Sequence, residues 1–374
     1  SASQNSVFSE SLKPSNLDPI TVIGSRLDQK LSKTITSTSV YTKDEIKRSG
    51  SKSVADFLQG ELSIEVGRSG GLGSQTSFFL RGAESRNVLI FVDGVRVRDN
   101  ITQSALAENI PLALINRIEI VRGNVSSLYG DGAIGGAIFI TTNLSNKSLD
   151  DFSNKSVNSE FGDFNTKDLS FNYNFRSKEG LGLYFAAQHL KSDGFSASNP
   201  QKTFSSDPTD KDNDAHENNS LIFGINKSIN NLVFGAKFYG TRAKTMFDNS
   251  FLGNDPRQNA DHDLVNLFAE VELSNMLKSK INYGISEINL SYNYGDFFKT
   301  EQKQISILNT LDFGTNKKII FGYENRDQKR NPASSGLSER QINSIFLGYI
   351  ADFDRISIQF NVRNDDAVDV GSEL

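Results

Sequence analysis

The stretch INRIEIVRGNVSSLYGDGAIGGAIFITT, residues 115–142, decides between two very different folds. Within it, Gly130, Gly132 and Gly135 form the pattern G-x-G-x-x-G, which in a dinucleotide-binding fold follows a strand and opens a helix. Here the order is reversed, because the helix-like segment NVSSLY precedes the glycines and the strand-like segment GAIFITT follows them. We therefore interpret the glycines as the end of a short helix and a close backbone approach at a turn, rather than as a nucleotide site.

Patterns for catalysis lack their structural context as well. Residues 67–71 match G-x-S-x-G, but a nucleophile elbow needs a helix directly after the serine, and GGLGSQTS cannot supply one. The three histidines, His189, His216 and His262, are scattered over the second part of the chain, and cysteine is absent. The sequence therefore gives no support to a serine hydrolase, a thiol enzyme or a metal site built from histidine or cysteine.

The segments around the opening stretch predict a compact mixed α/β domain over residues 36–142. Thr42 and Glu45 are spaced as a capping box before a short helix that stops at Gly50, and SVADFLQ predicts a second short helix. The segments LSIEV, FFLRG, NVLIFVDGVRV and RIEIVRG are typical of strands. The length is that of an ordinary domain.

Beyond Thr142 the pattern changes to a two-residue alternation. In RISIQFNVRN, Ile356, Ile358, Phe360 and Val362 point one way and the polar residues point the other. The same alternation recurs over 169–175, 181–187, 232–238 and 265–273. Short polar turns such as SKEG, KSINN and GTNKK alternate with long polar loops at 191–219, 243–262 and 327–340. Short turns at one side and long loops at the other are typical of a transmembrane β-barrel.

The number of strands predicts part of a large barrel. About 11 strands of ~10 residues fit between Ser156 and Asn364. Bacterial single-chain barrels have even strand numbers, and only those of about 22 strands are wide enough to hold a domain inside. We therefore expect residues 143–374 to form the N-terminal half of an antiparallel transmembrane β-barrel, truncated within a longer protein, with the α/β domain inside it.

Composition agrees with this interpretation. The net charge of -5 argues against a basic surface for nucleic acid. The mean hydropathy of -0.40 suits a soluble protein, but equally a barrel that exposes only alternate residues to lipid. No apolar run approaches the ~18 residues of a membrane helix, and the Ser-rich N-terminus contains no apolar signal core.

Two long blocks carry a family resemblance. FFLRGAESRNVLIFVDGVRV (78–97) followed by residues 115–142 resembles, in order and spacing, the plug domain of TonB-dependent outer-membrane receptors. The resemblance implies a plug inside a barrel in the bacterial outer membrane, active import of a scarce nutrient, and neither an enzymatic activity nor a cofactor. Within the family, SGGLGSQTSFFLRG, AIGGAIFITT and KDNDAHENNSL are most similar to the cobalamin transporters. An iron-siderophore receptor of the same fold and a non-transporting truncated receptor or binding module are the alternatives.

Upstream, DPITVIGSR (18–26) resembles the family's Ton box. We expect residues 1–35 to be a flexible leader that offers a short β-prone segment to TonB, which would add to it as a strand. The implied TonB-binding residues are Asp18, Pro19, Ile20, Thr21, Val22 and Ile23. TonB works with ExbB–ExbD. The alternative is an ordinary first strand of the plug.

The resemblance also implies a ligand site on two plug loops. Its substrate-binding residues are Ser74, Gln75 and Thr76 in one loop and Thr102, Gln103 and Ser104 in the other. Hydroxyl and amide groups both donate and accept hydrogen bonds, which suits a neutral, amide-rich ligand such as cobalamin. An anionic siderophore would favour arginine or aromatic residues. Solvated loops without a ligand are the alternative.

An acidic run suggests a calcium site. The residues Asp207, Asp210, Asp212, Asp214 and Glu217 surround a single base, and carboxylates are ligands for calcium. The spacing is not that of an EF-hand. The resemblance to cobalamin transporters implies calcium ligands at Asp212, Asp214 and Asp248, although Ser196 stands where those transporters carry an aspartate. A solvated acidic loop is the alternative.

Overall fold

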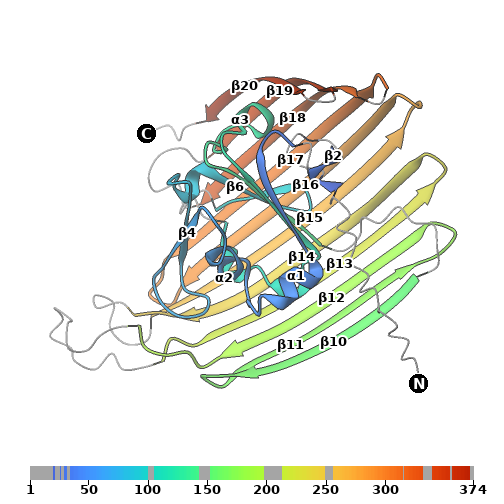
Figure 1. The fold of residues 1–374 in the computed structure, drawn as a ribbon. Helices are drawn as coiled ribbons and strands as arrows, with labels where there is room; N and C mark the ends of the chain where they lie inside the picture. The colour runs from blue at the N-terminus through green and yellow to red at the C-terminus, as the bar shows by residue number, and fades with distance from the viewer. Residues whose placement is uncertain are drawn as a thin grey trace, which may run out of the picture.

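The fold has two parts, a plug domain and a curved sheet (Figure 1). The computed structural model describes residues 20–21, 26, 29–31, 34–99, 105–142, 152–197, 213–248, 256–314, 316–331, 339–353 and 356–370. The plug domain, residues 34–142, lies against the concave face of the sheet. We refer to that sheet as the wall.

The plug domain has the mixed α/β structure predicted from the sequence. Its elements are β3 (Ser37–Thr42), α1 (Lys43–Arg48), α2 (Val54–Gln59), β4 (Ile64–Arg68), β5 (Thr76–Leu80), β6 (Val88–Val92), β7 (Val95–Val97), β8 (Arg117–Arg122), α3 (Ser126–Tyr129) and β9 (Gly136–Thr141). Both short helices begin at a capping box, Thr42 with Glu45 and Ser53 with Asp56, which explains why six-residue helices form there. Strand β3 was not predicted.

The central sheet of the plug has the order β3-β8-β9-β6-β7, and a separate hairpin joins β4 to β5. Strand β6 pairs in parallel with β9, and all five of its residues are buried, as expected for a strand covered on both faces. Ile90 and Ile138 pack in the cluster that contains helix α2. Leu89 and Phe139 pack on the opposite face, in a cluster that includes Ile320 of the wall. The wall therefore covers part of the plug core.

The wall is one antiparallel sheet of 11 strands paired in chain order, so the predicted strand number is confirmed. Its strands are β10 (Phe152–Gly162), β11 (Thr166–Arg176), β12 (Leu181–Ser192), β13 (His216–Ile229), β14 (Leu232–Met246), β15 (Arg257–Glu272), β16 (Leu277–Tyr292), β17 (Phe297–Asp312), β18 (Lys317–Asn331), β19 (Glu339–Phe353) and β20 (Ile356–Val370).

The connections confirm the predicted asymmetry, with narrower loops. The short-turn end of the wall carries the connections 177–180, 230–231, 273–276, 313–316 and 354–355, and the long-loop end carries 193–215, 247–256 and 332–338. Two connections at the long-loop end are also short, 163–165 and 293–296. The expected loops 191–219, 243–262 and 327–340 were too wide, because backbone ladder bonds continue into polar sequence.

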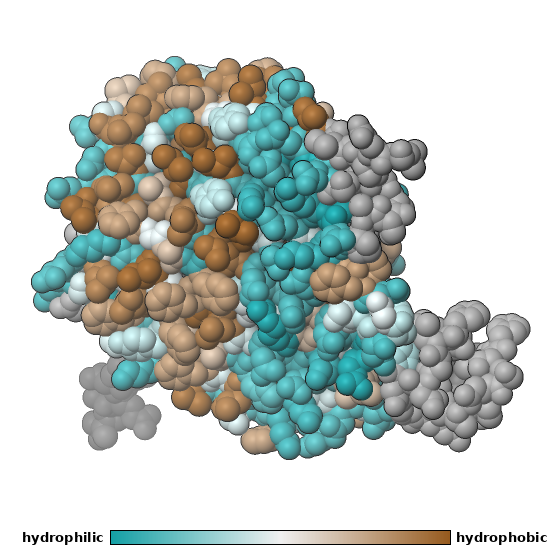
Figure 2. Space-filling view, turned by 180° about the vertical axis from the view of Figure 1, so that it is seen from behind, coloured by the Kyte–Doolittle hydropathy of each residue, from teal (hydrophilic) through white to brown (hydrophobic). Residues whose placement is uncertain are grey.

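The two faces of the wall differ in polarity. Figure 2 shows apolar side chains gathered over one side of the outer face, with a broad polar region beside them. Outward-facing apolar side chains include Phe171, Phe185, Phe223, Leu267, Tyr283, Phe321, Leu347 and Phe360. Buried polar side chains on the inner face include Ser170, Gln188, Asn218, Thr241, Asn266, Gln302 and Ser344. Apolar outside and polar inside is the pattern of a membrane barrel strand.

Helices contribute no membrane span in this structure. Among the residues described above, no helix has the length and apolarity needed to cross a bilayer.

Candidate functional site

The predicted TonB-binding segment begins in a small ladder. Strand β1 (Ile20–Thr21) pairs antiparallel with β2 (Gln29–Lys30), with Ile20 opposite Lys30. Asp18, Pro19, Val22 and Ile23 lie outside the described residues. Pairing with TonB therefore stays a prediction for this segment, and the structure gives its backbone a competing partner in β2.

Arg26 anchors the end of this segment to the wall. Its side chain is only 8% exposed, and its Nη2 lies 2.9 Å from Oε1 of Glu324 on β18. The guanidinium also lies over two rings, 4.7 Å from the centroid of Tyr129 and 4.2 Å from that of Phe346. Glu324 accepts a second charged hydrogen bond of 2.6 Å from Arg363 of β20. A buried charge held by both a counter-charge and ring faces is an effective anchor.

The first predicted ligand loop, at the tip of the β4–β5 hairpin, packs on the wall. Ser74 and Thr76 are buried, and the Thr76 hydroxyl donates to the Ser74 carbonyl, so only Gln75 is exposed. Gly73 has φ +76, and a Cβ there would overlap the ring of His216 on β13. The hairpin tip therefore lies at the long-loop end of the wall. Thr102, Gln103 and Ser104 fall outside the described residues.

The glycines of the opening stretch lie at the end of a short helix and let other groups approach the backbone closely, as interpreted from the sequence. Gly130 ends α3 with φ +82, and a Cβ there would lie 3.1 Å from Nε of Arg363. At Gly132, with φ +80, a Cβ would lie 3.0 Å from Nη1 of Arg98 and 3.2 Å from Nη2 of Arg96. The positive φ at both positions favours glycine, and a Cβ there would also force the neighbouring arginines to move. The glycines serve arginine packing, and a helix precedes them, in agreement with the sequence argument.

Between those glycines, Asp131 joins the plug to the wall. Its carboxylate lies 3.0 Å from Nη1 of Arg96, contacts Arg326 of β18, and lies 3.4 Å from Nη1 of Arg340 of β19. Burial alone would raise the pKa of Asp131, but the charges of Arg326 and Arg96 outweigh it and hold the pKa well below its ordinary value. We name Arg96, Arg98, Arg326 and Arg340 around Asp131 the arginine cluster.

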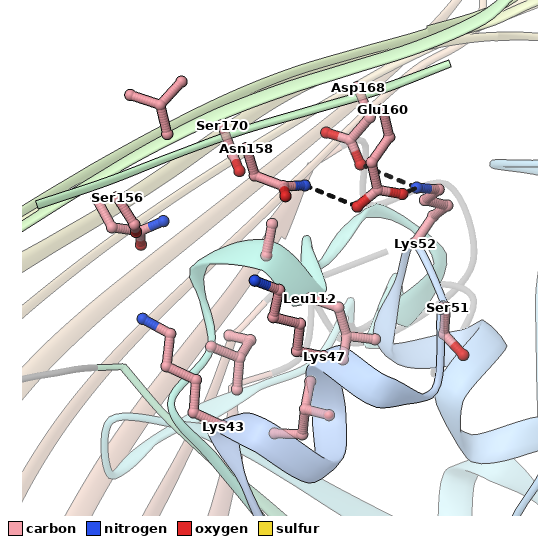
Figure 3. A pocket seen from close by; sticks show the side chains of 16 residues that line it. Lys43, Lys47, Ser51, Lys52, Leu112, Ser156, Asn158, Glu160, Asp168 and Ser170 are labelled. Atoms are coloured by element: carbon pink, nitrogen blue, oxygen red, sulfur yellow. Dashed lines mark hydrogen bonds and ion pairs between the residues drawn. The ribbon is translucent and has the colours of Figure 1, made fainter. Parts of the chain in front are cut away.

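On the opposite side of the plug, α1 faces β10 and β11 across a cavity of about 110 Å³. Figure 3 shows Lys43 and Lys47 pointing from α1 toward Ser156 and Asn158. Lys52 contacts Glu160 and lies 3.5 Å from Oδ2 of Asp168. Burial lowers the pKa of Lys43. We name this contact region, with Lys43, Lys47 and Lys52 on one side and β10 and β11 on the other, the lysine seam.

A further carboxyl is buried in the plug without an ion pair to any described residue. Glu108, in the short 3₁₀ turn Ala107–Asn109, is buried, and its Oε2 accepts no hydrogen bond from the described residues. Burial raises the pKa of Glu108 to about 8, against a smaller opposing effect from Arg68. The group is therefore largely protonated at neutral pH.

The predicted calcium ligands are only partly placed. Asp214 accepts a 2.9 Å hydrogen bond from the Ala197 amide, and Asp248 accepts one of 3.5 Å from the Ser196 hydroxyl. Both side chains therefore bind residues 196–197. These hydrogen bonds connect segments of two loops at the long-loop end. Asp212 lies outside the described residues. Within the described part of the chain, no three His, Cys, Asp or Glu residues are grouped as metal ligands.

The sequence did not single out Arg26, Glu324, Asp131 or the arginine cluster. A usable signal was the polar run YENRDQ in the middle of a wall strand, because its alternate residues must face inward. Periodicity indicates the face of a residue but not its partner across the interior.

Comparisons with known proteins agree with the geometry. Residues 30–137 match the TonB-dependent Receptor Plug Domain family. The chain is 34% identical over 185 residues to the vitamin B12 transporter BtuB of Vibrio vulnificus strain CMCP6, a match that covers 49% of this chain and 30% of that protein. The matched region thus spans less than a third of that relative.

Solved structures share the fold at low sequence identity. The siderophore receptor PirA from Acinetobacter baumannii superposes with a TM-score of 0.70 at 15% identity, over 88% of this chain and 56% of that one. The copper transporter OprC gives a TM-score of 0.69 at 12% identity, over 88% and 55%. These likenesses concern the fold, and the proteins named differ in what they carry.

Proposed function

We propose that this chain, which carries the plug domain and 11 wall strands of a TonB-dependent outer-membrane receptor, takes part in the active import of a scarce nutrient across the outer membrane. The observation that carries the proposal is a plug held by ion pairs on the polar inner face of a sheet whose outer face is apolar. Lipid would contact the outer face. Transport of this kind breaks no bond in the ligand, so we propose no enzymatic activity.

Energy would enter through the leader. Ligand binding at the long-loop end would release residues 18–23, and TonB, driven by ExbB–ExbD, would add a strand to them. For this segment to move away, the Arg26–Glu324 pair must break, because Arg26 lies only three residues beyond Ile23. Force on the leader would then act first at this contact with the wall.

Proline at position 22 tests the coupling. Val22→Pro removes one backbone N–H that strand addition requires, so we expect uptake in cells to fall strongly while ligand still binds to isolated outer membranes. Val22→Ala, which keeps the N–H, is the matched control. Unaltered uptake in Val22→Pro would contradict the pairing role.

Cobalamin is the ligand we propose, supported by the 34% identity to a vitamin B12 transporter in the half of the chain that matches it. The residues proposed to reach it are Ser74, Gln75 and Thr76, with Gln75 the exposed one, and Thr102, Gln103 and Ser104. A siderophore is the second candidate, favoured by fold likeness to PirA. Competition between radiolabelled cobalamin and ferric siderophores on outer membranes separates the two.

We also propose that calcium binds Asp212, Asp214 and Asp248. If it does, adding calcium should raise the melting temperature, and Asp248→Asn should abolish this rise.

A non-transporting binding module is the remaining alternative. Recovery in the soluble fraction instead of the membrane fraction would favour that module over a receptor.

A further inference from the structure

Among the described residues, the arginine cluster places four guanidinium groups around the carboxylate of Asp131. Burial lowers the pKa of Arg98, the charges of Arg326 and Arg340 lower it further, and the charges of Asp131 and Asp99 oppose this shift. Asp99 already accepts a 2.9 Å hydrogen bond from Thr300. Arginine charges therefore converge on Asp131 from the plug and from two strands of the wall.

Some hydrogen-bond donors of the cluster also find no acceptor among the described residues. The side chain of Arg96 is only 1% exposed, and its Nε donates no hydrogen bond to any described residue. The Nε of Arg326 is likewise buried, and no described residue accepts a hydrogen bond from it. Burial lowers the pKa of Arg96 to about 9, which still leaves the guanidinium charged at neutral pH. Buried donors on charged groups are costly unless an acceptor reaches them.

Solvent reaches the cluster from one side. The side chains of Asp131 and Arg340 are 36% and 39% exposed, in contrast to the buried Arg96. An oxyanion could therefore enter beside Asp131 and contact guanidinium groups that already converge. Guanidinium groups bind phosphate and carboxylate through paired hydrogen bonds.

The register of the wall places the cluster near the long-loop end. The side-chain amide of Gln302 donates a 2.8 Å hydrogen bond to the Arg96 carbonyl, and Thr300 donates one to Asp99. Because β17 begins at Phe297, the chain from Arg96 to Asp99 runs toward the long loops. It leads directly into residues 100–104, which contain one of the two predicted ligand loops.

We propose that the arginine cluster is a binding site for an oxyanion, a phosphate or carboxylate group of the transported ligand, and that Asp131 is its internal competitor. The inference rests on the proposed import function and adds a chemical requirement for the ligand. A phosphodiester, as in cobalamin, and the carboxylates of a ferric chelate share this chemistry.

The test measures inorganic phosphate binding to the protein with its complete natural sequence, purified in detergent, at ionic strength kept constant with chloride. We expect saturable stabilisation by phosphate. Arg340→Gln should weaken phosphate binding roughly tenfold, since it removes one charged hydrogen bond. Asp131→Asn should strengthen it several-fold, because it removes the competing charge. Arg242→Gln, which alters an exposed arginine paired with Asp263 on the outer face, is the matched control and should change nothing.

A cluster that only clamps the plug gives a different result. Both Arg340→Gln and Asp131→Asn would then lower the melting temperature, and neither would alter the response to phosphate beyond that of chloride. That result overturns the proposal, and so does a change of phosphate affinity in the same direction in both variants. Arg340→Lys, which keeps the charge, guards against misfolding, and it should retain most of the phosphate response.

The same measurement with two candidate ligands identifies the source of the oxyanion. Cyanocobalamin offers a phosphodiester and ferric citrate offers carboxylates, and the true ligand class should repeat the opposite shifts of Arg340→Gln and Asp131→Asn. Neither arm needs TonB. Phosphate binding without any TonB-dependent uptake would therefore refute the import function alone, whereas uptake without phosphate binding would refute the oxyanion site alone.

Discussion

The plug meets the wall at two contrasting regions. Along β18–β20 the ion pairs are largely buried: Asp131 of the plug contacts Arg326, and Glu324 pairs with Arg26 of the leader and with Arg363 of the wall. Along β10–β11 the lysine seam has a cavity of about 110 Å³, and the carboxylate of Glu160, which pairs with Lys52, is 50% exposed. The same kind of interaction, an ion pair between plug and wall, therefore occurs in two very different environments.

The environment decides what each pair contributes. Removing one partner of a buried pair leaves an uncompensated charge away from water, whereas an exposed pair loses little because water replaces the partner. We infer that the plug is held mainly by β18–β20 and that the lysine seam opens at lower cost. The end of the leader is fixed at the more strongly held side, through Arg26.

The largest effect is expected at Glu324. Glu324→Gln leaves Arg26 and Arg363 without their shared carboxylate, so we expect the free energy of unfolding to fall by about 3–5 kcal/mol. A nitroxide label at position 21 should become more mobile, because the leader loses its anchor. Denaturant unfolding in detergent and the label spectrum measure the two effects.

The matched control is Glu160→Gln in the lysine seam, the same chemical change at an exposed pair. It should cost less than about 1 kcal/mol and leave the label spectrum unchanged. Equal losses at the two sites would show that burial does not distinguish the two regions. Arg26→Gln combined with Glu324→Gln should cost less than the sum of the single changes, because the two groups interact directly.

Glu108 allows the effect of burial to be measured without that of pairing, because it is buried but forms no ion pair with a described residue. Its pKa of about 8 in the folded protein exceeds the ordinary value of 4.5. Between these two pH values the unfolded chain releases the proton and the folded chain keeps it, so stability should fall as the pH rises and level off above about pH 8. Glu108→Gln should remove this slope and gain about 2–4 kcal/mol at pH 9.

Unfolding of both proteins at pH 4, 7 and 9 measures the effect of Glu108. At pH 4 the carboxyl is protonated in both states, so the two proteins should be about equally stable. Glu65→Gln, on an exposed residue of β4, is the control and should run parallel to the parent protein. If the stability of Glu108→Gln also followed that of the parent protein at all three pH values, the carboxyl would have a hydrogen-bond partner that offsets its burial.

Local features of the fold could be predicted from the sequence because they depend on near neighbours. The predicted capping box at Thr42 uses residues three positions apart, and the alternation of Ile356, Ile358 and Phe360 fixes which side of a strand faces out. The limits of the loops were less accurate, because β-ladders extend into polar sequence where no membrane demands apolar residues.

The contacts between plug and wall could not be predicted in the same way. Arg26 and Glu324 are 298 residues apart in the chain, and no local pattern relates them. Asp131 lies within the decisive stretch, yet its three arginine contacts come from β7, β18 and β19. The sequence argument for a neutral ligand counted the polar residues of two loops and did not consider the arginines that the fold gathers around Asp131.

Gly132 tests how tightly the arginine cluster is packed. Gly132→Ala forces a Cβ to within 3.0 Å of Nη1 of Arg98 and 3.1 Å of the Arg86 carbonyl, at a φ of +80. We expect a loss of about 2–3 kcal/mol, the sum of backbone strain and overpacking. Gly50→Ala has a similar φ of +69 but nothing within 4 Å, so it should show the strain alone, about 1 kcal/mol. Denaturant unfolding of both variants isolates the packing contribution, and equal losses would mean that the arginines yield without cost.

The smallest effect is expected in the lysine seam at Lys52. Lys52→Gln removes the cation next to Glu160 and Asp168, but neither carboxylate is left stranded: Glu160 is half exposed, and Asp168 still accepts a 2.7 Å hydrogen bond from Gln188. We therefore expect a loss of about 0.5 kcal/mol in dilute salt that disappears near 1 M salt, where charges at exposed sites are screened. The loss caused by Glu324→Gln should survive the same salt, because water and ions do not reach that pair. If salt removed both losses, or if Lys52→Gln cost as much as Glu324→Gln, the plug would be held equally on its two sides, and the leader would not be tied to the stronger one.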